Sequence, residues 1–254
     1  MDLTAYIRQR QQEKGLLLMT HIVVGYPSYE ASYAIVKEMV AAGVDLMELQ
    51  LPFSEPMADG PVIMRANQEA LEAGATVAAG LDFARRMAAE FSIPFLVMSY
   101  YNLLFKHGEA GFVAAMAERG LAGAIVPDLP PEEGGAYLEA MTRHRLDPVL
   151  IYAPTTTEER LTWLARHARG FVYCVARKGV TGAPTEFAAD LDAYLARCRR
   201  HTDLPLAVGF GVKQREDIEF LAGRADVAVI GTQAIRVFDE GGAAAVGRFL
   251  RELR

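Results

Sequence analysis

Short apolar runs alternate with longer amphipathic stretches along the whole chain. Most of the runs are nearly continuous in apolar residues, a pattern that favours strands buried on both faces. Eight such runs are found, over Leu16–Val23, Leu46–Leu51, Phe95–Met98, Gly123–Val126, Pro148–Tyr152, Phe171–Val175, Leu206–Val208 and Val227–Ile230. The pattern therefore predicts eight buried strands.

The stretches between these runs repeat their apolar residues with a helical period. The predicted helices cover Tyr29–Ala42, Val62–Ala73, Val77–Glu90, Gly111–Arg119, Glu132–His144, Glu158–His167, Asp190–His201, Gln214–Ala222 and Ala243–Leu253. Gly43, Gly74, Gly120 and Gly223 follow four of them, as expected for helix C-caps. A further helix over Thr4–Gln12 is predicted to cover the bottom of the fold.

Repeated strand–helix units imply parallel strands joined by right-handed crossovers. Eight units in 254 residues favour closure into a barrel, which typically needs about 250 residues. An open doubly wound sheet would want a GxGxxG loop after the first strand, where the chain has Gly25-Tyr26-Pro27-Ser28. No linker or low-complexity tract interrupts the pattern. We expect an α/β fold, a single-domain (β/α)8 TIM barrel over residues 1–254 with an extra N-terminal helix.

Composition narrows the class of protein. Hydrophobic residues make up 52% of the chain, and the net charge of −6 argues against nucleic acid and anionic membranes as main partners. The sequence contains neither a signal-peptide pattern nor an apolar run of the ~20 residues that span a bilayer, so we expect a cytoplasmic protein. Cys174 and Cys198 show no metal-like spacing and are interpreted as reduced, partly buried thiols; no metal is expected.

The second predicted strand carries a carboxylate where barrels carry their chemistry, near the C-terminal ends of the strands. Side chains alternate along a strand, so Met47 and Leu49 should face the helices while Glu48 and Gln50 point into the barrel. An inward carboxylate suits proton transfer. Pairing of Glu48 with a buried cation or a hydroxyl is an equal alternative on spacing alone.

The loop after this strand, residues 52–61, is longer than the usual two to six residues of such loops, and long loops over a barrel mouth are often functional. Asp59 is a candidate second acid–base or electrostatic group. A turn or helix-cap role before Gly60-Pro61 is the simpler alternative. Glu55 is interpreted as a solvated loop-tip residue or a partner contact.

Three glycine-bearing loops follow the sixth, seventh and eighth strands, over residues 179–182, 209–211 and 231–232. Glycines let backbone amides approach an anion closely, and barrels often bind phosphate after strands seven and eight with a short extra helix. Thr232 is predicted to cap such a helix at Gln233–Val237. Phosphate binding is favoured, with simple turn chemistry as the alternative.

At this point the residues resemble a family. The stretch from Glu48 to Pro61, ELQLPFSEPMADGP, looks like the signature of the tryptophan synthase alpha chain. Further motifs follow in the family's order: Gly25-Tyr26-Pro27, Tyr100-Tyr101-Asn102, Asp128-Leu129-Pro130, Arg177-Lys178-Gly179-Val180-Thr181-Gly182 and Gly209-Phe210-Gly211. The resemblance covers nearly the whole chain.

The resemblance implies a lyase that needs no cofactor and cleaves indole-3-glycerol phosphate to indole and glyceraldehyde 3-phosphate by a retro-aldol reaction. Glu48 matches the general acid–base that protonates the indole ring and later accepts the side-chain hydroxyl proton. Asp59 matches the carboxylate that stabilises charge at the indole nitrogen. Two carboxylates in different environments can divide these tasks.

The resemblance also implies a pocket and a partner. Pocket-lining positions match Tyr173, Tyr100, Phe210 and Thr181; phosphate ligands match Gly182, Gly211, Gly231 and Thr232. The family works as an α2β2 complex, in which indole passes to a β chain that carries pyridoxal phosphate. Positions that match contacts to that β chain are Glu55, Pro56, Asn102, Phe105 and Pro130.

Five residues depart from the family's usual pattern: His21, Tyr26, Gln50, Pro127 and Lys178. Gln50 stands in place of glycine, takes space near the mouth and is expected to bond Glu48 or the substrate. His21 stands in place of an aromatic residue against the indole ring, where it could stack or titrate near neutrality. A histidine that lines the barrel without a proton role is the simpler alternative.

Other functions stay open beside the lyase of a tryptophan synthase complex. One is a lyase that acts alone, and another is a non-catalytic or weakly active subunit that activates a β chain, with Gln50 crowding the site. A third is another barrel enzyme acting on a phosphorylated metabolite. A Schiff-base aldolase is disfavoured, because the strand runs contain no lysine.

Overall fold

The computed structural model describes residues 1–176, 184–209 and 211–254. Its strands form a closed parallel barrel in the order β1 to β8, each strand pairing with its sequence neighbours and β8 with β1. The described strands are β1 Leu17–Val23, β2 Leu46–Gln50, β3 Phe95–Met98, β4 Gly123–Ile125, β5 Asp147–Tyr152, β6 Val172–Val175, β7 Leu206–Gly209 and β8 Val227–Ile230. The predicted barrel is thus confirmed, with every strand within two residues of its expected ends.

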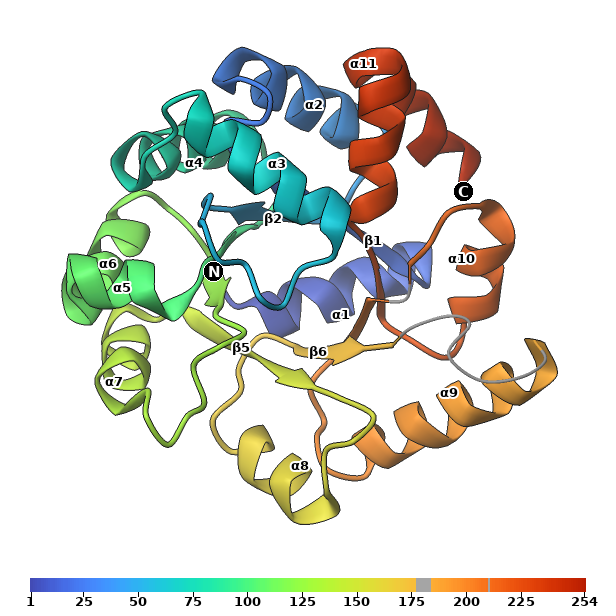
Figure 1. The fold of residues 1–254 in the computed structure, drawn as a ribbon. Helices are drawn as coiled ribbons and strands as arrows, with labels where there is room; N and C mark the ends of the chain where they lie inside the picture. The colour runs from blue at the N-terminus through green and yellow to red at the C-terminus, as the bar shows by residue number, and fades with distance from the viewer. Residues whose placement is uncertain (177–183, 210) are drawn as a thin grey trace.

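Helices surround the strands when the molecule is viewed along the barrel (Figure 1). Their bounds are α1 Leu3–Lys14, α2 Tyr29–Ala41, α3 Pro61–Glu72, α4 Val77–Glu90, α5 Tyr101–His107, α6 Glu109–Glu118, α7 Gly135–His144, α8 Glu158–Ala165, α9 Pro184–Arg199, α10 Arg215–Leu221 and α11 Thr232–Glu252. Gly43, Gly74, Gly120 and Gly223 all adopt positive φ, as the predicted C-caps require.

Four features of the helices differ from the sequence prediction. Helix α9 begins at Pro184, six residues before the predicted start at Asp190. Helix α5 was not expected, because its seven residues are too few to show a clear period. Helix α7 begins at Gly135, since the turn after Pro130 first closes through a bond from Glu133 N to Pro130 O of 3.0 Å. The short helix after β8 is the first part of α11, which continues across a non-helical Gly242.

Two layers of apolar side chains hold the barrel together. The outer layer lies between strands and helices and includes Met47 and Leu49, whereas the inner layer includes Leu46 and Leu96. Burial of both layers supplies the main driving force for folding. The alternation predicted for β2 is therefore confirmed by where its apolar residues pack.

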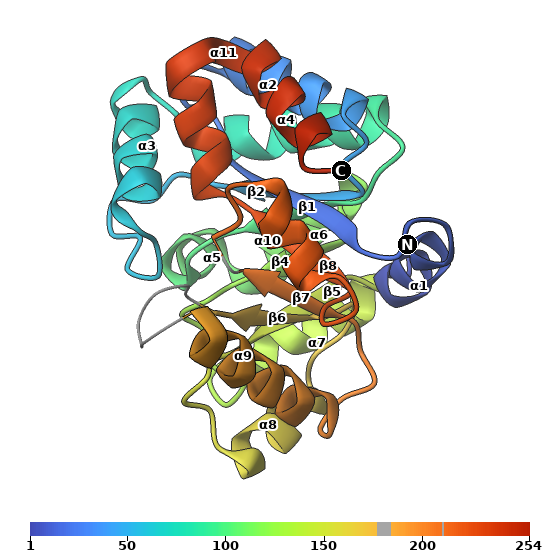
Figure 2. The same cartoon turned by 90° about the vertical axis from the view of Figure 1, so that its right-hand side faces the viewer.

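Helix α1 closes the bottom of the barrel, as predicted. Leu3 and Ile7 are fully buried in the inner layer, and Thr4 Oγ1 donates to Gly170 O at 2.8 Å. Figure 2 shows α1 on one side of the barrel and the loop that leads into α3 on the other. The C-terminal ends of the strands are thereby left open toward that loop.

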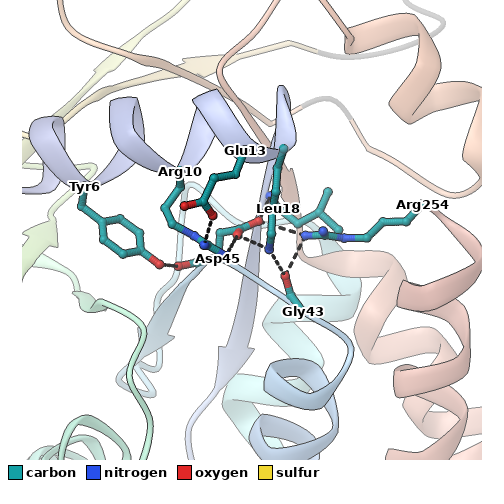
Figure 3. Close-up of polar contacts among 8 residues, drawn as sticks. Tyr6, Arg10, Glu13, Leu18, Gly43, Asp45 and Arg254 are labelled. Carbon is teal, nitrogen blue, oxygen red and sulfur yellow. Dashed lines mark hydrogen bonds and ion pairs between the residues drawn. The ribbon is translucent and has the colours of Figure 1, made fainter.

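A buried carboxylate, Asp45, joins α1 and the end of the chain to this closed bottom (Figure 3). Its Oδ1 accepts from Lys14 Nζ at 2.5 Å, and its Oδ2 accepts from Arg254 at 2.9 Å and from Leu18 N at 3.0 Å. Arg10 lies 3.5 Å from Oδ1. Each oxygen of Asp45 thus faces a cation, which offsets the cost of burying its charge.

The two cysteines lie in the outer layer. Cys174 on β6 and Cys198 on α9 are both free and both fully buried. Burial agrees with the interpretation of both as packed thiols.

Candidate active site

Glu48 lies in the barrel interior, beside His21, because of the register of β1 and β2. The strands pair in parallel so that His21 and Glu48 are direct neighbours across the sheet. Both side chains point inward by alternation, and His21 Nδ1 lies 3.4 Å from Glu48 Oε1. Glu48 is 3% exposed, and no Lys or Arg among the described residues pairs with it. The buried partner of Glu48 is thus an imidazole, which is a cation when it is protonated.

The environment of His21 favours its protonated form. Burial by itself lowers the pKa of His21, but the Glu48 carboxylate, with smaller contributions from Asp59 and Gln50, outweighs burial, and the net pKa is raised. An imidazole beside a carboxylate can hold one carboxylate oxygen in place and leave the other free.

Glu48 opens into a cavity of about 410 Å³ at the C-terminal ends of the strands. Size and position match a site for a small metabolite. The wall is formed by His21, Glu48, Ala58, Asp59, Gly60, Ile63, Met98, Ile125, Pro127, Ile151, Tyr173, Val175, Ala176, Gly209, Gly211, Val212, Lys213, Val229, Gly231, Thr232, Gln233 and Arg236. The cavity therefore brings Glu48 together with Asp59, Tyr173 and the glycine loops after β7 and β8.

Asp59 reaches this cavity from the loop between β2 and α3. Its Oδ2 accepts hydrogen bonds from Gln50 Nε2 at 2.7 Å and from the Tyr100 hydroxyl at 2.9 Å. The Tyr100 hydroxyl in turn accepts from Ala58 N at 3.1 Å, and its ring stacks on Phe53. Asp59 is therefore held by side chains of the barrel itself. Its alternative as a helix cap is excluded, because Gly60 is the N-cap of α3 and has no side-chain cap bond.

Two expected pocket residues lie just outside the cavity wall. Tyr100 and Gln50 are fully buried. Both bond Asp59 on the cavity wall, and Gln50 also lies beside His21, whose pKa it raises. In place of the predicted bond to Glu48, Gln50 donates to Asp59, because the long loop folds back over the end of β2. Its contact with a substrate stays a prediction.

Tyr173 on β6 lies on the cavity wall, as expected. Burial, followed by the charges of Glu48 and Asp59, raises the pKa of Tyr173, so its hydroxyl stays neutral. Gly209 makes room for this ring, since a Cβ there would lie 2.9 Å from Tyr173 Cε1. The glycine at 209 is thus explained by a close approach to Tyr173.

The far end of the cavity is suited to an anion. Gly211, Gly231 and Thr232 line it, and α11 begins there, so the free N–H groups of its first turn face the cavity. The prediction that Thr232 caps this helix is wrong, because Gly231 occupies the N-cap and Thr232 is the first helical residue. Helix formation starts one residue earlier than the glycine–threonine pattern indicates.

Sequence reasoning missed two cations at this end. Lys213 and Arg236 line the same part of the cavity, are exposed, and make no ion pair within the described ranges. The sequence could have indicated Arg236, because it follows Thr232 by about one helical turn and therefore lies on the same face of the helix. Thr181, Gly182 and Phe210, three further predicted site residues, lie outside the described residues.

The expected partner contacts lie around the cavity mouth. Glu55 and Asn102 are exposed, Phe105 is 67% exposed, Pro130 is partly buried and Pro56 is buried. Met57, on the same loop as Glu55, is 81% exposed. Phe105 and Met57 are therefore large apolar side chains open to solvent on these two segments.

Comparison with known proteins decides the family. The family model described as "Tryptophan synthase alpha chain" matches residues 7–248. The chain belongs to the tryptophan synthase alpha chain family.

Curated tryptophan synthase alpha chains are similar to this chain over nearly its full length. The tryptophan synthase alpha chain of Desulforapulum autotrophicum is 61% identical over 251 residues, covering 99% of both chains. That of Syntrophotalea carbinolica is 59% identical over 248 residues, covering 98% of both.

Solved structures agree as well. A chain of Mycobacterium tuberculosis tryptophan synthase superposes with a TM-score of 0.91 at 32% identity, covering 99% of this chain and 96% of that one. The alpha subunit from Legionella pneumophila gives a TM-score of 0.90 at 28% identity, covering 100% and 97%.

Membership of the tryptophan synthase alpha chain family settles the reaction class. The chain is a carbon–carbon lyase of tryptophan biosynthesis, an indole-3-glycerol-phosphate lyase. The family needs no cofactor, and pyridoxal phosphate belongs to its β chain. Within the described residues, no group of His, Cys, Asp and Glu could hold a metal ion, and no helix is long and apolar enough to cross a membrane.

Departures from the usual alpha-chain pattern find physical explanations in the structure. Tyr26, in place of an aspartate, donates to Asp239 Oδ1 at 2.8 Å and accepts from Arg65 at 2.6 Å, which ties the loop after β1 to α3 and α11. Pro127 forms part of the cavity wall. Lys178 lies outside the described residues.

Proposed function

We propose that Glu48 is the general acid–base of the retro-aldol cleavage and that Asp59 stabilises charge at the indole nitrogen. The observation that carries the proposal is the cavity shared by the two carboxylates, neither of which forms an ion pair with Lys or Arg in the described parts of the chain. A carboxylate without a Lys or Arg partner has an oxygen free to exchange a proton with a substrate or to face its developing charge.

The chemistry requires two proton transfers at separate atoms of the substrate. Protonation of the indole ring at the carbon that bears the side chain forms an indolenine, whose positive nitrogen draws electrons from the breaking carbon–carbon bond. Removal of the proton from the adjacent side-chain hydroxyl completes the cleavage and releases an aldehyde. Glu48 would make both transfers, while Asp59 would face the nitrogen.

The phosphate end supports this orientation of the substrate. Gly211, Gly231 and Thr232 are the proposed phosphate ligands, together with the undescribed Gly182, and Lys213 and Arg236 add positive charge nearby. Backbone N–H groups at a helix start bind a phosphate without a full counter-charge. An anchored phosphate would leave the indole ring beside Glu48, Asp59 and Tyr173, with Thr181 and Phe210 as further proposed pocket residues.

The proposed assembly is an α2β2 heterotetramer in the cytoplasm, in which residues 1–254 act as one barrel domain. Glu55, Pro56, Asn102, Phe105 and Pro130 are the proposed β-chain contacts. Support comes from the exposure of Phe105 and Met57 near the cavity mouth, where indole would leave. Pyridoxal phosphate would be bound only by the β partner.

The test is indole release from indole-3-glycerol phosphate by the purified chain, alone and with its cognate β chain. We expect release in both conditions and a faster rate in the complex, with light scattering reporting an α2β2 mass. No release in either condition would overturn the proposed roles. Rate enhancement of the β reaction without any indole release would instead identify an activating subunit.

A further inference from the structure

Gln50 occupies a rigid position at the end of β2. The side chain is fully buried, and the backbone is held on both sides, with Val24 N donating to Gln50 O at 2.9 Å and Met98 as its neighbour in register on β3. Alternation points the side chain inward, yet Gln50 is not on the cavity wall. Its side chain instead contacts two residues of that wall, Asp59 and His21.

The amide of Gln50 faces the loop that carries Asp59. Nε2 donates to Asp59 Oδ2 at 2.7 Å and, more weakly, to Asn67 Oδ1 at 3.4 Å. Asn67 Oδ1 also accepts from Phe53 N at 2.9 Å, and Asn67 Nδ2 donates to Ile63 O at 2.8 Å. Since a carboxylate and an amide oxygen only accept, these partners select the orientation with the nitrogen of Gln50 toward Asp59.

The second donor to Asp59 converges on the same oxygen. The hydroxyl of Tyr100 reaches Oδ2 at 2.9 Å from β3's side of the barrel. Among the described residues no donor reaches Oδ1, and Asp59 itself lies on the cavity wall. One oxygen is thus fixed by the barrel, and the other remains available to a ligand.

The tip of the loop adds little apolar restraint. Ser54, Glu55 and Met57 are exposed, and Met57 is 81% exposed, so the orientation of the Asp59 carboxylate depends mainly on the side chains that bond it. A catalytic carboxylate on such a loop loses rate when it samples other orientations, because misplacement by about 1 Å can cost roughly 10²-fold.

We propose that Gln50 is a positioning residue that holds Asp59 in its working orientation before substrate binds. The inference rests on the proposed role of Asp59. Where glycine stands at this position, as the family resemblance indicates is usual, no side chain can make this bond, so here Gln50 supplies an additional fixed donor. Because Gln50 stays outside the cavity, its loss should lower kcat and leave KM for indole-3-glycerol phosphate nearly unchanged.

The experiment is a double-mutant cycle on indole release, with Gln50→Met, Asp59→Asn and the double variant assayed in the complex with the β chain. Methionine keeps the length of the side chain and removes the donor. Loss of a hydrogen bond to a charged group predicts a fall in kcat of roughly 10-fold. In the Asp59→Asn background, Gln50→Met should change kcat less than about 2-fold, because the positioned carboxylate is already absent.

Gln50→Gly is the second variant, because the usual glycine makes it compatible with the fold. It should lower kcat with KM spared, as Gln50→Met does. Equal losses from Gln50→Met in both backgrounds, or a rise in KM with kcat unchanged, would overturn the positioning role. An Asp59→Asn variant with near-normal kcat would instead overturn the proposed role of Asp59, so the two failures are distinguishable.

Discussion

Asp45 and Glu48 are neighbouring buried carboxylates whose surroundings differ completely. Asp45, just before β2, lies at the closed end of the barrel, where Arg254 and the amide of Leu18 contact its oxygens (Figure 3). Lys14 Nζ also donates to Asp45 Oδ1. Glu48, within β2, lies at the open end, where its one described ionic neighbour is His21. Both are almost inaccessible to solvent.

The difference teaches how one strand supports both stability and chemistry. The charge of a carboxylate surrounded by cations and amide donors is balanced within the folded chain. Such a carboxylate stabilises the fold only while its partners remain. A buried carboxylate with an incomplete set of partners is costly to the fold and ready for a substrate. Burial alone therefore does not separate the two; the number and charge of the partners do.

The largest expected effect is loss of turnover at the open end. Glu48→Gln keeps the size of the side chain but removes the group that accepts and donates the proton, so indole release should fall about 10²- to 10⁴-fold. On the alkaline side of the raised pKa of His21, where the imidazole is neutral, the melting temperature should be nearly unchanged, because no Lys or Arg loses its partner. Near-normal activity in this variant would refute the contrast drawn with Asp45.

Loss of Asp45 should show the opposite behaviour. Asp45→Ala leaves Lys14 and Arg254 without their counter-charge and Leu18 N without an acceptor, so the free energy of unfolding should fall by about 3 kcal/mol. This value is taken at the low end for buried pairs, because the two cations are partly exposed. Urea unfolding measures the loss, and kcat of the folded fraction should stay near wild type. A large fall in kcat without destabilisation would contradict the structural role.

The His21–Glu48 pair should make stability depend on pH. Because the pKa of His21 is raised in the folded state, its contribution is fully present below the unfolded value of about 6.5 and is lost as pH rises through the folded pKa. The difference in unfolding free energy between wild type and His21→Phe should therefore shrink, by about 1 kcal/mol, from pH 6 to the alkaline side of that pKa. A difference independent of pH would indicate that His21 acts only through packing.

The smallest effect is expected for a single cation of the Asp45 cluster. Arg254→Ala removes one partly exposed partner, while Lys14, Arg10 and Leu18 N remain around Asp45. The unfolding free energy should fall by about 0.5–1 kcal/mol, well below the loss in Asp45→Ala. An equal loss in the two variants would show that Arg254 alone supports Asp45.

Local sequence patterns were enough to predict the barrel and the inward orientation of Glu48. Nearly continuous apolar runs predicted all the strands of the barrel, and strand alternation placed Glu48 inside. These predictions succeed because the period of a strand and the burial of both its faces are properties of adjacent residues. The helix at Tyr101–His107 was not predicted, because seven residues are too few to show a clear helical period.

Tertiary structure alone decided which partners the carboxylates have. Nothing local distinguishes Asp45 from Glu48, since their partners come from α1, the chain's last residue and β1. Likewise, alternation pointed Gln50 inward, but only the folded-back loop turned its amide toward Asp59. The sequence by itself thus determined the barrel and the inward carboxylate, because both follow from periodicity. The partners of each charge depend on which distant segments meet, and only the closed barrel specifies that.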